Sequence, residues 1–144
     1  MKTNFFGVLA ALLVAIALSA CAEMAAEPAP KEPPPSPEEK VVATAEFEGS
    51  GSYDVAGTLS VNELDGQLTL RFADDFSSSS GPDLYVWLVK DEGDLSSALE
   101  LGELKGNSGT QSYELPVGTD VEDYSHVYIW CKRFSALFGR AALK

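Results

Sequence analysis

The sequence is poor in the residues that hold metal ions and redox cofactors. Its 144 residues include two cysteines, one histidine and two methionines. Two cysteines are too few for a disulfide framework, and a blue-copper site requires two histidines with a cysteine. An iron–sulfur cluster needs several thiolates, and a haem would find one strong ligand, His126. We therefore expect that this chain alone binds no metal ion and no redox cofactor.

Basic residues are scarce as well. Ten Lys and Arg stand against 22 Asp and Glu, which gives a formal net charge of −12 at pH 7. A phosphate backbone is bound by clustered Lys and Arg that displace its counterions. Anionic lipid headgroups attract basic segments for a similar electrostatic reason. The composition therefore argues against a nucleic-acid partner and against charge-driven adhesion to anionic lipid.

The apolar run near the N-terminus is too short to cross a membrane. Residues 5–18 follow Lys2 without a charge, and at about 1.5 Å per residue they cannot span a hydrocarbon core of about 30 Å. A charged start, a short apolar run and small residues after it are typical of a secretory signal. We therefore predict that residues 1–20 are a signal peptide.

The end of that segment reads Leu18-Ser19-Ala20-Cys21 and resembles the lipobox of bacterial lipoproteins. The resemblance implies that the Cys21 thiol is lipidated, that residues 1–20 are removed and that the new amine is acylated. Several acyl chains give stable attachment where one is marginal. We expect an extracytoplasmic protein anchored by Cys21 to the lipid bilayer of the cell membrane or outer membrane, and Ala22 favours the outer one. An ordinary signal peptide with a coincidental cysteine is the alternative.

Residues 21–40 contain six of the eight prolines and five glutamates. Proline lacks an N–H and fixes φ, so the segment cannot pair in a sheet or continue a helix. We predict a disordered, extended linker after the lipidated cysteine, and a proline-rich ligand for a partner is the alternative.

Residues 41–144 have a hydrophobic period of mostly two, which predicts short strands. Residues 84–89 are apolar on both faces and predict a central strand covered on both sides. Residues 94–101 are the one stretch that predicts a helical turn, with Asp94 as its N-cap and Gly102 as its stop. About seven to nine short strands separated by turn signals predict an all-β domain, an antiparallel β-sandwich. The strands predicted by name are 53–61, with Gly57 as a bulge or close-approach point, 67–72, 84–89, 126–131 and 136–143.

Three phrases, in this order and spacing, resemble the DM-thirteen domain, also called the electron-transfer DM domain. The resemblance spans nearly all of residues 43–143 and implies an all-β domain, which in bacteria often stands alone in lipoproteins. It also implies that Cys131 is the cysteine proposed as redox-active in that family. Many members have a histidine where this chain has Tyr53, so a role that needs this imidazole is in doubt. The phrases are residues 80–86, residues 101–107 with 111–116, and residues 127–135 with 138–139.

Cys131 is the most informative residue of the domain. In an oxidising compartment an unpaired thiol is a liability unless it is buried or used. It is either a small core residue beside Val127 and Ile129, or a reactive thiol whose thiolate character is raised by nearby cations. Strand alternation would place Arg133 on its side of the sheet. We predict Trp130, Lys132 and Arg133 as the residues that contact a partner.

The sequence contains no evident nucleophile and base pair, so it favours a protein without catalytic activity. The loop around Ser108 lacks the pattern of a nucleophile elbow. His126 lies five residues before Cys131, an odd spacing that places the two on opposite faces of a strand. Two hypotheses remain. The first is a membrane-anchored accessory of extracytoplasmic electron transfer, acting through Cys131 with a redox or envelope protein partner. The second is a non-catalytic binding or envelope-structural module in which Cys131 only packs.

Overall fold

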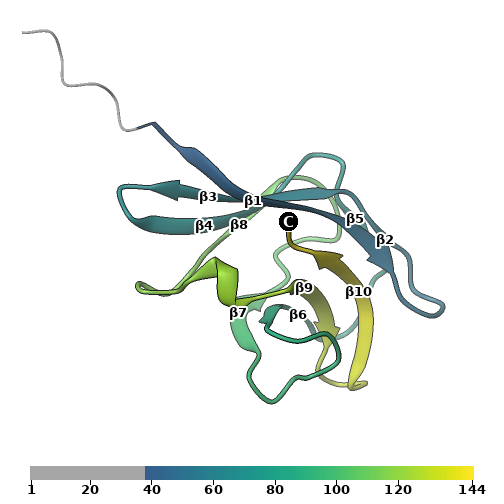
Figure 1. Ribbon diagram of the computed structural model, residues 1–144. Helices are drawn as coiled ribbons and strands as arrows, with labels where there is room; N and C mark the ends of the chain where they lie inside the picture. Colours follow the sequence, from purple (N-terminus) through teal and green to yellow (C-terminus); the bar gives the residue numbers. More distant parts are fainter. Residues whose placement is uncertain (1–37) are drawn as a thin grey trace, which may run out of the picture. The chain divides into compact units, whose positions relative to one another are not determined.

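The computed structural model describes residues 38–144, which form an all-β domain (Figure 1). The predicted signal peptide, Cys21 and the linker up to residue 37 lie outside the described residues. Within residues 38–144 no helix has the length and apolar character needed to cross a membrane. The elements are β1 (Lys40–Gly49), β2 (Val55–Ala56), β3 (Thr58–Leu64), β4 (Gln67–Phe72), β5 (Ser77–Ser78), β6 (Leu84–Val89), β7 (Leu99–Glu103), β8 (Gln111–Glu114), the 3₁₀ turn η2 (Val121–Asp123), β9 (His126–Cys131) and β10 (Ala136–Ala142).

Eight strands form one antiparallel sheet in the order β7-β6-β9-β10-β1-β3-β4-β8. Strand β1 belongs to both halves of this sheet, because its first residues pair with β3 and residues 47–49 pair with β10. The sheet therefore folds over at β1 into two layers, with β3, β4 and β8 in one and β10, β9, β6 and β7 in the other (Figure 1). The predicted antiparallel β-sandwich is confirmed.

The two edge strands approach each other, so the sandwich is nearly closed like a barrel. Residues 104–110 connect β7 to β8, and the backbone N–H of Lys105 donates to the hydroxyl of Tyr113 over 2.9 Å. Burial and this contact act in opposite directions on the pKa of Tyr113, and burial dominates and raises it. The connection between the two edge strands is in this way hydrogen-bonded to a side chain of β8.

The core lies between the layers and is built by strand alternation. Phe47, Phe72 and Phe76 meet there with ring centroids 4.6 to 5.3 Å apart. Strand β9 contributes Val127 and Ile129, which are fully buried. Burial of this apolar area is the main favourable term in folding.

Gly57 separates β2 from β3 and confirms the predicted close-approach point. Its φ is +112°, and a Cβ at this position would lie 2.5 Å from the Cα of Phe76. Only glycine combines that conformation with so close a backbone. The approach lets the β2–β5 pair lie against the larger sheet and places Phe76 in the core.

Two sequence predictions about local structure are wrong. Residues 94–101 form no helix: the Asp94 carboxylate accepts the N–H of Ser96 over 2.8 Å in a turn, and β7 then pairs with β6. The edge of β6 needs a hydrogen-bonding partner, and this requirement outweighs a weak local preference for helix. The prediction that β6 is covered on both faces is also wrong in part, because Tyr85 and Trp87 are only half-buried on the outer face, whereas Val89 on that face is fully buried. Strands β1 and β8 and the η2 turn were not predicted.

Candidate functional site

The solvent side of β6 and β9 carries four aromatic residues, which we call the aromatic face: Tyr85, Trp87, Tyr128 and Trp130. Their position follows from the strand period of two, which sends alternate residues of β9 into the core. Tyr85 is opposite Trp130 and Trp87 is opposite Tyr128 in the sheet register. The rings of Trp87 and Trp130 stack with centroids 5.5 Å apart. Three of the four are half-buried, and Tyr128 is 2% exposed.

Lys132, one of the predicted partner-contacting residues, borders the aromatic face. Its ammonium lies 3.6 Å from the ring centroid of Tyr85 and 2.7 Å from the Glu100 carboxylate. The hydrogen bond to Glu100 raises the pKa of Lys132, so the cation persists at neutral pH. The Tyr85 hydroxyl donates to Glu103 over 3.1 Å, and this bond raises the pKa of Tyr85. A lysine held over a ring in this way is a cation–π contact.

The turn at residues 132–135 connects β9 to β10 and projects into solvent. Arg133 is exposed and forms no ion pair with another described residue. Phe134 is 57% exposed. Ser135 has a φ of +45°, an uncommon conformation for a residue other than glycine. The turn thus places a cation and an exposed ring beside the end of the aromatic face.

Cys131 is the last residue of β9 and lies on the core side, opposite to the aromatic face. It is 0% exposed and is the free cysteine of the described residues. Its neighbours across the sheet are Leu84 and Ala136. Lys132 lies on the other side of the sheet, over Tyr85. The thiol and the three predicted contact residues are therefore adjacent in the chain, but the strand separates the thiol from the surface that Trp130 and Lys132 form.

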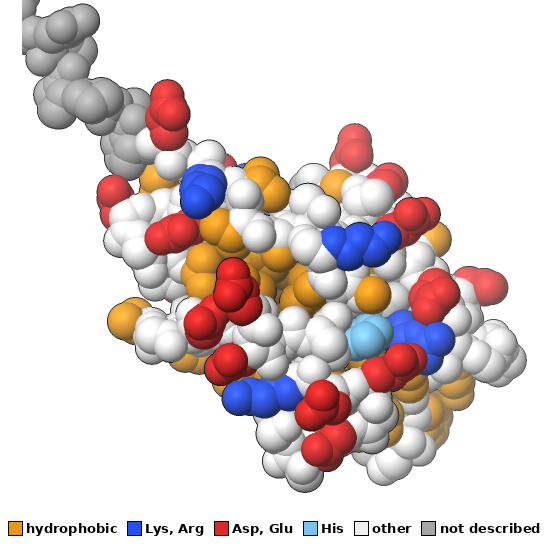
Figure 2. Space-filling model, in the orientation of Figure 1, with side chains coloured by type: hydrophobic (Ala, Val, Ile, Leu, Met, Phe, Trp, Pro, Cys, Tyr) orange, Lys and Arg blue, Asp and Glu red, His pale blue; other side chains and the backbone are white. Residues whose placement is uncertain are grey.

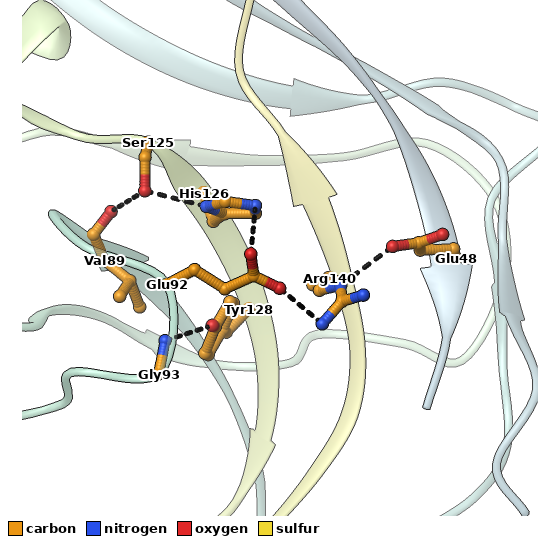
Figure 3. Close-up of polar contacts among 8 residues, drawn as sticks. All are labelled: Glu48, Val89, Glu92, Gly93, Ser125, His126, Tyr128 and Arg140. Carbon is orange, nitrogen blue, oxygen red and sulfur yellow. Dashed lines mark hydrogen bonds and ion pairs between the residues drawn. The ribbon is translucent and has the colours of Figure 1, made fainter. Parts of the chain in front are cut away.

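A chain of polar contacts crosses the opposite flank of the aromatic face (Figure 3). The Ser125 Oγ lies 2.7 Å from Nδ1 of His126, and Nε2 of His126 lies 4.0 Å from the Glu92 carboxylate. Glu92 pairs with Arg140 at 2.5 Å, and Arg140 also donates to Glu48 over 2.8 Å. The bond to Glu48 raises the pKa of Arg140. These contacts fasten the loop after β6 to β9, β10 and β1.

Sequence reasoning missed this group because its members come from four separate segments. The neighbours Ser125 and His126 would have been visible as a pair, and with Glu92 they match the residue types of an acyl-transfer triad. A triad also needs its base to be oriented by the acid, and the 4.0 Å between His126 and Glu92 exceeds hydrogen-bond length. The hydroxyl and the backbone N–H of Ser125 both donate to the carbonyl of Val89, over 3.4 and 2.9 Å, and tie the start of β9 to the end of β6. His126 is on the face opposite to Cys131, as predicted.

A cavity of about 340 Å³ opens between this polar group and the aromatic face. The loop that forms one wall is held by the Tyr128 hydroxyl, which accepts the N–H of Gly93 over 2.9 Å (Figure 3). Its lining includes Glu92, Leu95, Tyr128, Trp130, Leu137 and Arg140. No group of three His, Cys, Asp or Glu side chains within residues 38–144 is placed to hold a metal ion.

Tyr53 occupies the position where the resemblance suggested a histidine. Its ring stacks on Phe138 with centroids 3.7 Å apart and an interplanar angle of 11°. Phe138 is fully buried in β10, the strand next to that of Cys131. Tyr53 therefore closes one side of the core by packing, without an imidazole.

Comparison with known proteins agrees with the phrases read from the sequence. The family model described as Electron transfer DM13 matches residues 46–143, from within β1 to the residue after β10. No curated protein and no solved structure matches the chain significantly. The resemblance stated from the sequence is confirmed at the level of the domain. Because the match covers more than half of the chain, this protein belongs to the electron transfer DM13 family.

Proposed function

We propose that this DM13 domain is a membrane-tethered accessory of extracytoplasmic electron transfer. In this proposal it docks on a redox partner protein through the aromatic face and the turn at residues 132–135, and Cys131 is its reactive thiol. The family description supports the link to electron transfer. The observation that carries the proposal is the end of β9, where Trp130 faces solvent and Cys131, one residue on, faces the core.

The composition of this surface supports protein docking. Trp, Tyr, Phe and Arg are the residues enriched at the centres of protein interfaces, and here Trp130, Tyr85, Phe134 and Arg133 gather with Lys132 at one end of two strands. Phe134 is exposed although it is a large apolar side chain. A partner that covers it would remove that ring from water and add a favourable hydrophobic contribution.

The proposed chemistry is exchange between the Cys131 thiolate and a disulfide of the partner. The thiolate attacks one sulfur, a mixed disulfide forms, and the other sulfur leaves as a thiolate that takes up a proton. Because Cys131 is fully buried, the step requires local opening of the β9–β10 turn. Cys131 is the last strand residue before that turn, and ends of strands beside exposed turns open at lower free energy than strand centres.

The tether in this proposal is the lipidated Cys21 followed by the proline-rich linker. Strand β1 begins at Lys40, and Glu39 already pairs with Arg71 at 3.0 Å, so the domain's own contacts begin one residue before the strand. An anchor at Cys21 with a spacer of this length would keep the domain at the extracytoplasmic surface of the cell membrane or outer membrane.

A second candidate function is a non-catalytic binding or envelope-structural module. The observation that favours it is the complete burial of Cys131 among core residues. In that case the aromatic face still binds a partner, and Cys131 behaves as a small hydrophobic residue.

Reaction with a small aromatic disulfide distinguishes the two functions. The chain carries a Cys21→Ser substitution, so that Cys131 is the one thiol, and is kept folded without denaturant. The proposal expects one mixed disulfide per chain, formed faster than the chain unfolds globally. A thiol that stays unreactive until the domain is denatured would exclude the redox function and leave the binding module.

A further inference from the structure

The cavity beside the aromatic face combines an apolar wall with a polar wall. Trp130, Tyr128, Leu137 and Leu95 supply the apolar wall, and the Glu92–Arg140 pair supplies the polar one. The volume of about 340 Å³ lies in the range of small-ligand pockets. Both walls are held in place, since Gly93 is bonded to Tyr128 and Trp130 is stacked on Trp87. The cavity is therefore formed before any ligand arrives.

The polar wall offers both hydrogen-bond acceptors and donors. One oxygen of Glu92 is bonded to Arg140, while the other lies 4.0 Å from Nε2 of His126. That distance exceeds hydrogen-bond length, so this oxygen can still accept a hydroxyl proton. Arg140 uses two of its nitrogens on Glu48 and Glu92 and retains further N–H donors.

The charge of the site limits its ligand. Arg140 is shared between Glu48 and Glu92, so this group carries one excess negative charge; the chain carries −12, and Asp and Glu side chains are spread over the face shown in Figure 2. An anion is therefore repelled by the domain, and a small hydrated cation would leave the apolar wall of the cavity without a partner. A wholly apolar ligand would take the ion pair out of water without supplying new partners, which is costly. A neutral molecule with an apolar face and several hydroxyl groups satisfies both walls.

We propose that this cavity binds a neutral saccharide, with one sugar ring lying on Trp130 and its hydroxyl groups bonded to Glu92 and Arg140. The inference does not depend on the redox function of Cys131. A free oligosaccharide and the end of a surface glycan share this chemistry, and either would hold the domain beside carbohydrate in the cell envelope.

The test is a titration of the full chain with maltotriose, cellotriose and an N-acetylglucosamine trimer, followed by tryptophan fluorescence. Both tryptophans, Trp87 and Trp130, belong to the aromatic face, so the signal has no other source. The chain is kept in a detergent without a sugar headgroup. We expect a saturable change with a Kd on the order of 1 mM. Sedimentation with insoluble cellulose then distinguishes a free oligosaccharide from a surface glycan as the ligand. Binding to the polymer without binding to the trisaccharides would identify the ligand as a glycan chain.

The variants locate the binding. Trp130→Phe should weaken it several-fold and Trp130→Ala at least about tenfold, and Glu92→Gln should weaken it several-fold because an amide is a poorer acceptor than a carboxylate. The matched controls Tyr124→Ala and Glu122→Gln remove a ring and a charge outside the cavity and should leave the Kd unchanged. Circular dichroism confirms that each variant is folded.

Three results would overturn the inference. The first is the absence of saturable binding by any neutral saccharide up to about 50 mM and by cellulose. The second is binding that folded Trp130→Ala and Glu92→Gln retain unchanged. The third is binding restricted to uronic acids or amino sugars, which would assign a charged ligand class.

Discussion

At the scale of single residues, the central contrast is between Trp130 and Cys131. One peptide bond separates a half-exposed ring from a thiol with no accessible surface. The sequence alone predicted both residues as functional but could not decide whether the thiol is reactive or packed, because its surroundings include residues such as Leu84 from a strand much earlier in the chain. The structure places the thiol in the core, so its reactivity depends on how readily the end of β9 opens.

Substitution of Cys131 tests its packing separately from its chemistry. Cys131→Ala should lower the free energy of unfolding by about 1–2 kcal/mol, since it leaves a small void. Cys131→Ser should lower it by about 2–4 kcal/mol, since a hydroxyl would be buried in apolar surroundings. Urea denaturation measures both. A serine variant as stable as the wild type would mean that position 131 is reached by water.

Glu39 should make the stability depend on acid pH. Its hydrogen bond with Arg71 lowers the pKa of Glu39 in the folded domain. The stability that this contact contributes is therefore complete above the pKa that Glu39 has in the unfolded chain. It is lost as the pH falls through the lower pKa that Glu39 has in the folded domain. We expect Glu39→Gln to have a slightly lower Tm than the wild type at pH 7, with the difference vanishing once the pH has fallen below the lowered pKa of Glu39 in the folded domain.

The control for that experiment is Glu38→Gln, which removes the same charge one residue earlier. Glu38 is exposed and takes part in none of the ion pairs of the described domain. Thermal unfolding by circular dichroism follows both variants from neutral to acid pH. A Glu39→Gln difference that persists unchanged into acid would contradict the assigned role of the Arg71 contact.

At the scale of elements, strong alternation was predictable and weak patterns were not. Strands β4, β6 and β9 were predicted with their observed limits because their residues alternate or are uniformly apolar. Strand β7 was predicted as a helical turn because its pairing partner, β6, lies ten residues earlier and is invisible to a local pattern. The polar group of Ser125, His126, Glu92, Arg140 and Glu48 was missed for the same reason, since only the sheet brings it together.

Gly57→Ala should disrupt the junction of β2, β3 and Phe76. A Cβ there would lie 2.5 Å from a backbone atom at a φ of +112°. We expect a loss of about 3 kcal/mol or more in the free energy of unfolding. Gly66→Ala is the matched control, because Gly66 also has positive φ but has open space around it, and it should cost about 1 kcal/mol. Equal losses in the two variants would show that the approach to Phe76 is looser than the structure indicates.

Tyr128→Phe should loosen the loop after β6 without unfolding the domain. The substitution removes the acceptor of the Gly93 N–H and keeps the ring. The expected cost is about 1 kcal/mol, and the Gly93 amide should exchange with solvent faster than in the wild type. Hydrogen exchange followed by NMR measures this. Unchanged protection of Gly93 would mean that another contact holds the loop over the cavity.

At the scale of the whole molecule, the proposed function combines the domain that the structure describes with a lipid anchor that was predicted from the sequence. The proposed chemistry and binding surfaces belong to the domain, while residues 1–37 lie outside the described structure, and their anchor was predicted from their composition and from the lipobox resemblance. The family match supports the domain and does not extend to the N-terminal residues. The anchor therefore needs its own experiment.

Cys21→Ser should abolish the lipid modification of the chain. Without the thiol no diacylglyceryl group can be attached, and an unlipidated chain has no acyl anchor. We expect the wild type to pellet with membranes and to carry the mass of the lipid on residue 21, while the variant stays uncleaved and unlipidated. Ala22→Ser is the control and should leave both properties unchanged. A wild-type chain whose mass shows no lipid would contradict the anchor.

The most direct test of the account is the urea dependence of Cys131 alkylation in the folded domain. The test chain carries Cys21→Ser, so that Cys131 is its one thiol. The control chain also carries Cys131→Ser and Ile129→Cys, so that its one thiol is at position 129. That position is buried on the same face of β9 and lies farther from the turn. The account predicts that Cys131 reacts through local opening, at a rate that hardly changes at low urea, while the thiol introduced in the control reacts only as fast as global unfolding allows. If both thiols follow global unfolding, Cys131 is a packing residue and the redox function is wrong.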